Sequence, residues 1–264
     1  YQFTLPPLVA HAILRQNADI LSQWAKSLEP PCGNTTFFNF LASHDGIGIR
    51  PAQDYLNQKE LDFLVQKTIS HGGQISTKNN PDGSKSPYEL NINYFSLLAS
   101  DDLEMSIKKF ALAHSILLAM PGVPAIYFHS LFGSINYLKG VEKTGQPRSI
   151  NREKTNAAEL RAELNNKDHR RARIYASLKK MLQIRCRCPP FSPQAEFQII
   201  DLGPKIFAIE RKSQSQKIIA IHNLSHKTCT VSLDEPMCDL LDKSHPRSKE
   251  CRMPPLSYRW MSQF

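Results

Sequence analysis

Hydrophobic residues in the first part of the chain follow helical spacing, then gather into a short continuous run. Pro6 to Leu28 carries a broad apolar face behind a starting proline, which predicts a helix that Glu29-Pro30-Pro31 stops. Thr35 to Leu41 is β-branched and aromatic, which predicts a strand buried on both sides, as in a parallel sheet. The run ends at the polar turn Ala42 to Gly46.

The same order of patterns then repeats. Pro51 to His71 is helical towards its end, and Gly72 to Lys85 is polar, which predicts a surface excursion. Asp101-x-x-Glu104 resembles a capping box with Asp101 as the cap. Pro121-Gly122 ends the helix that follows, and Val123 to Phe128 predicts a second short buried strand. This repetition is typical of a β/α barrel.

The helix after Asp101 has a stripe of residues at alternating steps of four and three, which predicts a face turned to the core. The stripe consists of Leu103, Ile107, Phe110, His114 and Leu117. We therefore interpret His114 as a core histidine.

The pattern changes towards the end of the chain. A polar stretch after Lys154 leads into a long helix around Arg173 to Ile184. From Phe197 onward, short hydrophobic runs separated by turn residues predict an antiparallel β-domain, with a boundary near 189–194. The expected strands cover 197–200, 206–210, 218–222 and 229–233.

Composition narrows the class of protein without settling its function. The 264 residues are 41% hydrophobic and 22% charged, which is typical of a globular chain, and no apolar run could span a membrane. Tyr1 to Leu8 does not resemble a signal peptide. Six irregularly spaced cysteines favour reduced thiols in a cytoplasmic protein and no metal site.

The net charge of +9 has an ordinary explanation. Basic residues gather at His169 to Arg173 and at Arg185 to Arg187, which we expect to form a solvated helix face. Because basic and aromatic residues do not interleave, we expect no nucleic-acid partner. A site that handles phosphate would also use positive charge.

Candidate chemistry follows the two predicted barrel strands. In a β/α barrel the active site lies at the carboxyl ends of the strands, and these strands end in His44-Asp45 and His129-Ser130. A carboxylate beside an imidazole can hold sugar hydroxyls and support positive charge on a sugar ring. A structural ion pair explains the His-Asp pair equally well.

Several longer motifs resemble the α-amylase superfamily in its sucrose phosphorylase branch. Residues 38–51, FNFLASHDGIGIRP, resemble the last conserved region, and PGVPAIY at 121–127 resembles the eighth barrel strand. Further similar motifs are QFTLPPLV at 2–9, YELN-x-NYF at 88–95, GS-x-N at 133–136, TG-x-x-R at 144–148 and INR at 150–152. The resemblance covers nearly the whole chain in order.

This resemblance implies a fold and site roles. Residues 1–190 would form the C-terminal part of a TIM (β/α)8 barrel, with an inserted segment at about 47–100, and 191–264 a small antiparallel β-domain. Asp45 would stabilise the oxocarbenium-like transition state, and His44 would bind the same glucosyl ring. Arg152 would contact the donor sugar or the phosphate.

Other residues would face the acceptor or support the site. Tyr88 and Glu89 would lie on the acceptor side. Arg148, Asn136 and His129 could either contribute to the site or fix loops through hydrogen bonds, and both readings stay open. Tyr94 and Phe95 are expected to pack.

Two residues that the chemistry needs are not found. Retaining glycosyl transfer uses a nucleophile and a general acid/base. In this superfamily the nucleophilic Asp lies in a Gly-x-Arg-x-Asp motif and the acid/base Glu closes the next strand, both upstream of the point where Tyr1 begins. The expected partner is therefore the missing N-terminal half of the same barrel. Without it, we expect residues 1–195 to be unstable or to oligomerise.

The function implied for the parent enzyme is that of a retaining α-glucosyl phosphorylase. It would transfer glucose from a small sugar substrate (sucrose, sucrose phosphate or glucosylglycerate) to inorganic phosphate, without a cofactor. The loop at 88–93 resembles the relatives that use glucosylglycerate or sucrose phosphate slightly more than sucrose phosphorylase itself. An α-amylase-type hydrolase fragment and a non-catalytic remnant are the alternatives.

Overall fold

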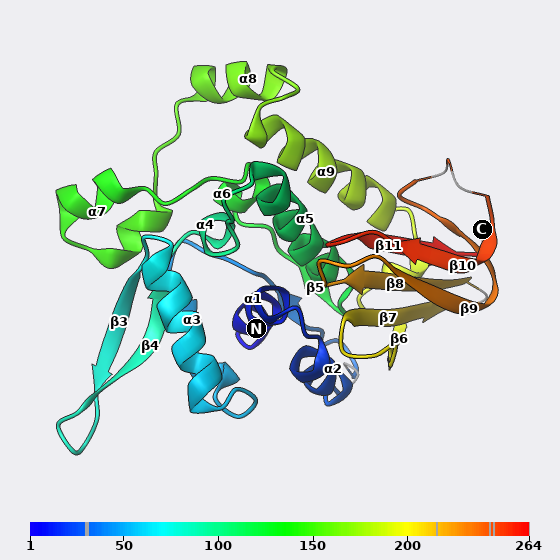
Figure 1. Cartoon of the computed structure of the whole chain (residues 1–264), viewed down its shortest axis with the longest axis horizontal. Coiled ribbons are helices and arrows are strands. Elements are labelled where there is room, and N and C mark those ends of the chain that lie inside the picture. Colours follow the sequence, from blue (N-terminus) through cyan, green and yellow to red (C-terminus); the bar gives the residue numbers. More distant parts are fainter. Residues whose placement is uncertain (30–31, 215, 243, 245, 264) are drawn as a thin grey trace.

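Helices and a large sheet occupy opposite sides of the molecule. The computed structural model describes residues 1–29, 32–214, 216–242, 244 and 246–263. In Figure 1 the helices fill the centre and left, the antiparallel strands lie at the right, and one hairpin extends away at the lower left. The helices are α1 (Leu5–Arg15), α2 (Asp19–Lys26), α3 (Gln58–Ser70), α4 (Tyr94–Leu97), α5 (Leu103–Ala119), α6 (Phe128–Leu131), α7 (Leu138–Thr144), α8 (Ala157–Asn165) and α9 (Arg170–Arg185). The short 3-10 helices are η1 (Arg50–Ala52), η2 (Pro147–Asn151) and η3 (Pro189–Phe191).

The strands form three sheets. They are β1 (Phe38–Asn39), β2 (Ile47–Gly48), β3 (Gln74–Asn79), β4 (Lys85–Asn91), β5 (Val123–Pro124), β6 (Glu196–Ile200), β7 (Ile206–Ser213), β8 (Gln216–Asn223), β9 (Cys229–Asp239), β10 (Ser248–Met253) and β11 (Tyr258–Ser262). The sheet orders are β1-β5, β2-β4-β3 and β10-β9-β11-β8-β7-β6.

The prediction of one helix from Pro6 to Leu28 is wrong, because α1 and α2 are separated by a turn. Gln16 takes a left-handed conformation, with φ of 53°. Asn17 then accepts a hydrogen bond from the amide of Asp19 at 2.7 Å, which starts α2. Both helices bury their apolar faces in one core, so the hydrophobic spacing continues across the break. Of the stop signal Glu29-Pro30-Pro31, the two prolines lie outside the described residues.

The two expected barrel strands are shorter and less buried than predicted. β1 and β5 pair in parallel over two residues each, Phe38 with Val123 and Asn39 with Pro124. Phe38 and Val123 are each 40% exposed, whereas Asn39 is buried and donates to the carbonyl of Pro121 at 2.7 Å. The last part of the second expected strand is the start of helix α6. Within the described residues few neighbours cover these strands. The prediction that they are buried on both sides is therefore wrong.

The polar excursion at Gly72 to Lys85 is an ordered hairpin. β3 and β4 pair from Gln74–Asn91 to Asn79–Lys85, and β2 adds a third strand through Ile47–Leu90 and Gly48–Glu89. The tip is closed by Asn80 and Ser84. The stretch does lie at the surface, as expected, but the alternation of half-buried positions makes it a strand pair. This sheet places Glu89 beside the turn after β1.

Helix α5 is the central helix of the molecule. Its N-cap is Asp102, which accepts from the amide of Glu104 at 2.9 Å, so the expected cap at Asp101 is one residue too early. Four residues of the expected stripe are buried, whereas Leu103 is 47% exposed. His114 is a core histidine, as predicted: it lies against the carbonyl of Phe110, and burial lowers its pKa to about 4.

The basic residues around α9 do not form the solvated face expected of them. Arg171 is buried and lies 3.0 Å from a carboxylate oxygen of Glu163. The guanidinium of Arg185 donates to the carbonyls of Leu118 and Gly122. The last carbonyls of a helix need such donors, so Arg185 of α9 caps the C-terminal end of α5 at Leu118.

The six-stranded antiparallel sheet confirms the predicted β character after residue 197. All its neighbouring strands are antiparallel, and β9 runs further than the expected 229–233. Side chains alternate between two cores. Phe207, Ile209 and Trp260 join the core shared with α1, α2 and α5, whereas Ala208 and Ile219 belong to a separate second cluster.

Buried polar contacts connect the sheet to α5. Arg211 is fully buried and donates to the carbonyls of Ala119, Met120 and Ser192. Ser115 contacts His222 and accepts from the indole nitrogen of Trp260, each at 3.0 Å. The division of the chain into domains at residue 190 stays a prediction. No helix in the described part is long and apolar enough to cross a membrane.

Candidate functional site

The candidate site lies where the turn after β1 meets the 3-10 helix η2. Leu41 is buried and anchors the end of β1, and the chain then turns outward through His44 and Asp45. Asn151 is buried at the end of η2 and donates to the backbone carbonyl of Asp45 at 2.9 Å. The hydroxyl of Tyr127, just after β5, donates to the carbonyl of Asn151 at 2.8 Å. The ends of the two barrel strands are thus joined through η2.

Two guanidinium groups hold the carboxylate of Asp45. Its Oδ1 accepts from Arg152 at 2.9 Å and lies 3.2 Å from the terminal nitrogen of Arg148. The Nε2 of His44 lies 3.6 Å from the same oxygen. In the described part of the chain, these contacts of the Asp45 carboxylate all end on Oδ1. The side chain is 34% exposed, so its other oxygen can meet a ligand from the open side.

Arg152 is held by the turn that it contacts. Its Nε donates to the carbonyl of His44 at 2.9 Å while its terminal nitrogen reaches Asp45. The two contacts orient the plane of the guanidinium against residues 44–45. Asp45 and Arg152, 107 residues apart in the sequence, therefore lie side by side.

Glu89 and Arg148 form the second half of the network. Arg148 binds the Glu89 carboxylate with two nitrogens, at 3.1 and 3.0 Å. One Glu89 oxygen also accepts from the amide of Gly46 at 3.2 Å. The Glu89 side chain is 5% exposed. Because its oxygens already have partners, Glu89 anchors Arg148 beside Asp45, and its contact with an acceptor stays a prediction.

Gly46 is needed for this close approach. A Cβ at this position would lie 2.7 Å from the Glu89 side chain and 2.7 Å from the backbone oxygen of Leu90. Only glycine therefore lets β4 pack on the turn that carries Asp45.

His44 and Tyr88 lie at the edge of this network of charged side chains. His44 is 67% exposed at its side chain and meets the carboxylate of Asp45 from the solvent side. Tyr88 is half-buried on β4, and its carbonyl accepts from the amide of Ile49. The structure therefore brings His44, Asp45, Glu89 and Arg152 together, with Tyr88 beside them.

The sequence motifs do not predict the role of Arg148 in the site. Among the described residues, its side chain is the only one that contacts the carboxylates of both Asp45 and Glu89. In the sequence it is marked by the TG-x-x-R motif at 144–148, which does not show its partners. Contact with Glu89 raises the pKa of the guanidinium, because the neighbouring carboxylates stabilise its charge.

Asn136 and His129 fix loops. Asn136 accepts from the amide of Asn93 and donates to the carbonyl of His71. His129 is buried, with Nδ1 2.9 Å from the hydroxyl of Ser134, and burial lowers its pKa. Both side chains therefore fix loops through hydrogen bonds, and a contribution to the site stays a prediction.

The network can bind and polarise a ligand. Both carboxylates are paired with arginine, which suits stabilisation of positive charge and binding of hydroxyls. Burial also raises the pKa of the Tyr127 phenol, which lies between the charges of Arg152 and Asp45. Among the described residues, no group of three His, Cys, Asp or Glu side chains could hold a metal ion.

Known proteins match the chain in sequence and in fold, although no family model matches it. Glucosylglycerate phosphorylase of Escherichia coli K12 is 44% identical over 216 residues, covering 81% of this chain and 38% of that protein. Glucosylglycerate phosphorylase of Allomeiothermus silvanus is 40% identical over 236 residues, covering 88% of this chain and 42% of that protein. The chain thus spans less than half the length of these relatives.

Among solved structures, sucrose 6F-phosphate phosphorylase from Thermoanaerobacter thermosaccharolyticum matches with a TM-score of 0.72 and 22% identity, over 85% of this chain and 43% of that one. At this identity the likeness concerns the fold alone. It confirms the predicted fold class, part of a (β/α)8 barrel with an antiparallel β-domain.

Fold and sequence together match part of a (β/α)8 barrel protein. The chain resembles the glucosylglycerate and sucrose phosphorylase branch of the α-amylase superfamily over most of its own length. The resemblance drawn from the motifs is confirmed.

Proposed function

We propose that this chain forms part of a retaining α-glucosyl phosphorylase and supplies its transition-state stabiliser and acceptor-side loops. One observation carries the proposal: the Asp45 carboxylate is held by Arg148 and Arg152 at the end of a barrel strand. A carboxylate in this position attracts the positive charge that builds on the glucosyl ring during bond cleavage.

Each group of the network has a role in this scheme. Arg152 fixes Asp45 Oδ1, which leaves the second oxygen to accept a sugar hydroxyl. His44 would bind the same ring from the edge of the network. Arg148, locked by Glu89, holds the carboxylate from the acceptor side and acts as a positioning residue. Inorganic phosphate is the co-substrate, and no cofactor is required.

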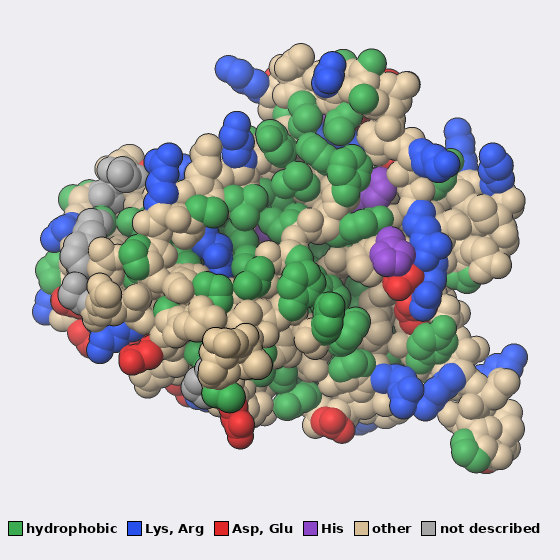
Figure 2. Space-filling model, turned by 180° about the vertical axis from the view of Figure 1, so that it is seen from behind, with side chains coloured by type: hydrophobic (Ala, Val, Ile, Leu, Met, Phe, Trp, Pro, Cys, Tyr) green, Lys and Arg blue, Asp and Glu red, His purple; other side chains and the backbone are tan. Residues whose placement is uncertain are grey.

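The nucleophile and the acid/base would come from a segment that corresponds to the rest of the relatives' barrel. Exposed apolar side chains on the barrel elements fit that role, because they would be covered in a closed barrel. They are Tyr1, Phe3, Phe38, Val123 and Phe128. Figure 2 shows hydrophobic side chains gathered across the middle of one face of the molecule.

The names of the relatives favour one class of substrate. Both relatives at 40% identity or more carry the name glucosylglycerate phosphorylase, whereas the sucrose 6F-phosphate phosphorylase is 22% identical. Glucosylglycerate is therefore the preferred glucosyl donor, and α-glucose 1-phosphate the product. We place this reaction in the cytoplasm, where phosphate and sugar phosphates are present.

A complementation experiment tests this function. The chain is co-expressed with the part of the E. coli relative that precedes its matched region, and glucosylglycerate is supplied with and without phosphate. We expect glucose 1-phosphate only with phosphate, and a loss of roughly 10²–10³-fold in turnover for Asp45→Asn. Asp54→Asn is the control at a solvent-facing position.

Two other outcomes would support the alternatives. Release of free glucose at the same rate with and without phosphate would make the assembled protein a hydrolase. An assembled, folded barrel that binds glucosylglycerate without turning it over would make the chain a non-catalytic remnant.

A further inference from the structure

Sulfur-containing side chains gather on one face of the six-stranded sheet, away from the sugar site. Three of the six methionines and two of the six cysteines lie in the second hydrophobic cluster, which is separate from the core around α5. They are Met237, Met253, Met261, Cys229 and Cys251. No group in the proposed catalytic network uses them.

The distances within this cluster are short. The Sγ of Cys251 lies 3.5 Å from the Sδ of Met253 and 3.8 Å from the Sδ of Met261. Sulfur ligands around one ion, with metal–sulfur bonds of about 2.3 Å, lie roughly 3.8–4.0 Å apart. The two distances from Cys251 Sγ to the methionine sulfurs are therefore close to the separation that a shared metal ion needs.

Strand pairing holds these side chains together. Cys251 and Met253 are two residues apart on β10 and point to the same face, opposite Val231 and Cys229 of β9. Met261 comes from β11, opposite Asp239 of β9. β9 pairs with both strands that carry the ligands, so the backbone holds the three side chains on one face of the sheet.

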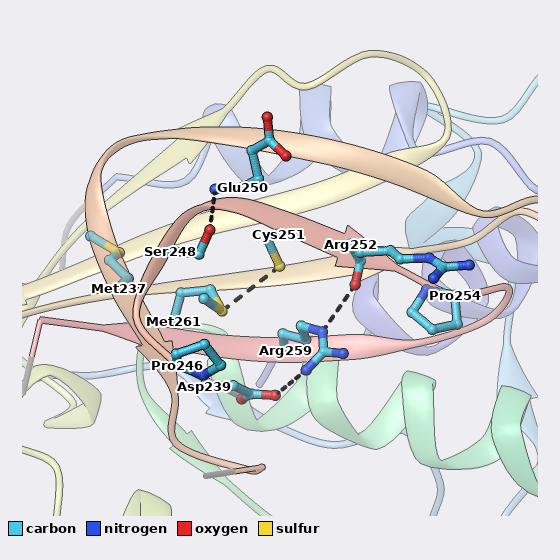
Figure 3. A pocket seen from close by; sticks show the side chains of 10 residues that line it. All are labelled: Met237, Asp239, Pro246, Ser248, Glu250, Cys251, Arg252, Pro254, Arg259 and Met261. Carbon is cyan, nitrogen blue, oxygen red and sulfur yellow. Dashed lines mark hydrogen bonds and ion pairs between the residues drawn. The ribbon is translucent and has the colours of Figure 1, made fainter. Parts of the chain in front are cut away.

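An open cavity leads to the sulfurs. It has a volume of about 530 Å³, and Met237, Cys251 and Met261 line its wall. Figure 3 shows the Cys251 and Met261 sulfurs turned towards each other, with the Arg259–Asp239 ion pair at one side. That pair is neutral as a unit, so the cavity beside the sulfurs carries little net charge.

We propose that Cys251, Met253 and Met261 form a binding site for a soft monovalent metal ion, Cu(I). Thiolate and thioether ligands select Cu(I) over harder ions. One thiolate and one monovalent cation are neutral together, which suits a site whose three side chains are at most 5% exposed. A divalent ion would leave an uncompensated charge among apolar residues.

The binding step is a ligand exchange without change of oxidation state. A bond forms between the Cys251 sulfur and Cu(I), and the thiol proton passes to solvent. The two thioether sulfurs each donate a lone pair to the ion. Neither oxidant nor reductant is needed.

The experiment uses the whole chain under anaerobic conditions, with Cys32, Cys186 and Cys188 replaced by Ser to remove the thiols outside the six-stranded sheet. Cu(I) is delivered from a coloured chelator whose absorbance reports the competition, and Ag(I) calorimetry gives an independent stoichiometry. We expect one ion per chain, and a shell of sulfur atoms alone by X-ray absorption.

Ligand variants sharpen the test. Cys251→Ser should abolish binding, and Met253→Leu or Met261→Leu, which conserve volume, should weaken it roughly 10–100-fold. Cys238→Ser is the matched control, because Cys238 faces Ser262 and points to the opposite side of the sheet from Met261. Circular dichroism checks that each variant is folded.

The proposal is overturned if the background chain binds no ion, or if both methionine variants bind as tightly as that chain. Binding that survives in folded Cys251→Ser would likewise place the ion elsewhere. In those cases the sulfurs only fill the core, as methionine often does.

Discussion

The six-stranded sheet buries its large hydrophobic side chains, whereas the barrel elements leave several of theirs exposed. In the sheet, β8 pairs with β7 over eight residues and with β11 on its other side. In the barrel part, and among the described residues, β1 pairs only with β5, over two residues. Trp260 in the sheet is fully buried, whereas Phe38 in β1 is 40% exposed. The sheet buries its large side chains against the helices, and the barrel part leaves a face that other strands could cover.

The difference shows where the stability of this chain should reside. Helix α5 belongs to both regions, because its inner face packs in the shared core and its C-terminal end receives arginines from the sheet and from α9. The barrel elements depend on this connection. Substitutions at the connection should therefore have larger effects than substitutions on the open face.

The largest effect is expected for Arg211→Ala. This change leaves the carbonyls of Ala119, Met120 and Ser192 without their buried donor, which should cost roughly 3–5 kcal/mol of unfolding free energy. Urea denaturation measures it, with the exposed neighbour Lys212→Ala as control. Equal midpoints for the two variants would mean that the regions are not joined here.

The largest part of the pH dependence should come from two histidines that are almost completely buried, His114 in α5 and His222 in β8. Burial lowers the pKa of His114 and of His222 to about 4, from an ordinary value of 6.5. Between these values the unfolded chain binds more protons than the folded one, so stability falls as pH drops from 6.5 towards 4. Each histidine contributes up to about 3 kcal/mol of this loss.

Denaturation at several pH values measures this slope, and single replacements separate the regions. His114→Asn and His222→Asn should each remove a large and similar part of the slope between pH 4 and 6.5. The exposed His226→Asn should leave it unchanged. A slope that survives both core replacements would assign the titration to other groups.

A smaller effect is expected for Gly46→Ala. The added methyl group would clash with Glu89 and with the backbone of Leu90, at a cost of roughly 1–3 kcal/mol. Gly48→Ala is a matched control two residues away, because no atom lies within 4 Å of the Cβ it would add. If the two alanine variants melt alike, β4 does not pack on the Asp45 turn as described.

The smallest change in stability is expected for Phe38→Ser on the open face. Because the ring is partly exposed, unfolding free energy should change by less than about 1 kcal/mol, while self-association should decrease. Sedimentation velocity over a range of concentrations measures the second effect. Tyr55→Ser, at another exposed ring, is the control. If Phe38→Ser associates as strongly as the unchanged chain, this face does not mediate self-association.

Much of the site is predictable from the sequence. Residues 38–51 and 150–152 carry motifs specific enough to assign Asp45 and Arg152 to one site, and the two side chains meet at 2.9 Å. The role of Arg148 is not predictable in this way, because its contact with Glu89 spans 59 residues and depends on how β4 packs on Gly46. No spacing along the chain contains that information.

Local patterns by themselves determined the class of fold, the central helix and the antiparallel end of the chain, because hydrophobic periodicity reflects which face of an element is buried. Only the tertiary structure decided the break at Gln16, the short strands β1 and β5, and the burial of Arg171 and Arg211. These features depend on neighbours distant in sequence: a carbonyl that needs a donor, or a strand that lacks a partner within the described residues. Such partners are set by packing in three dimensions, and a single segment of sequence does not encode them.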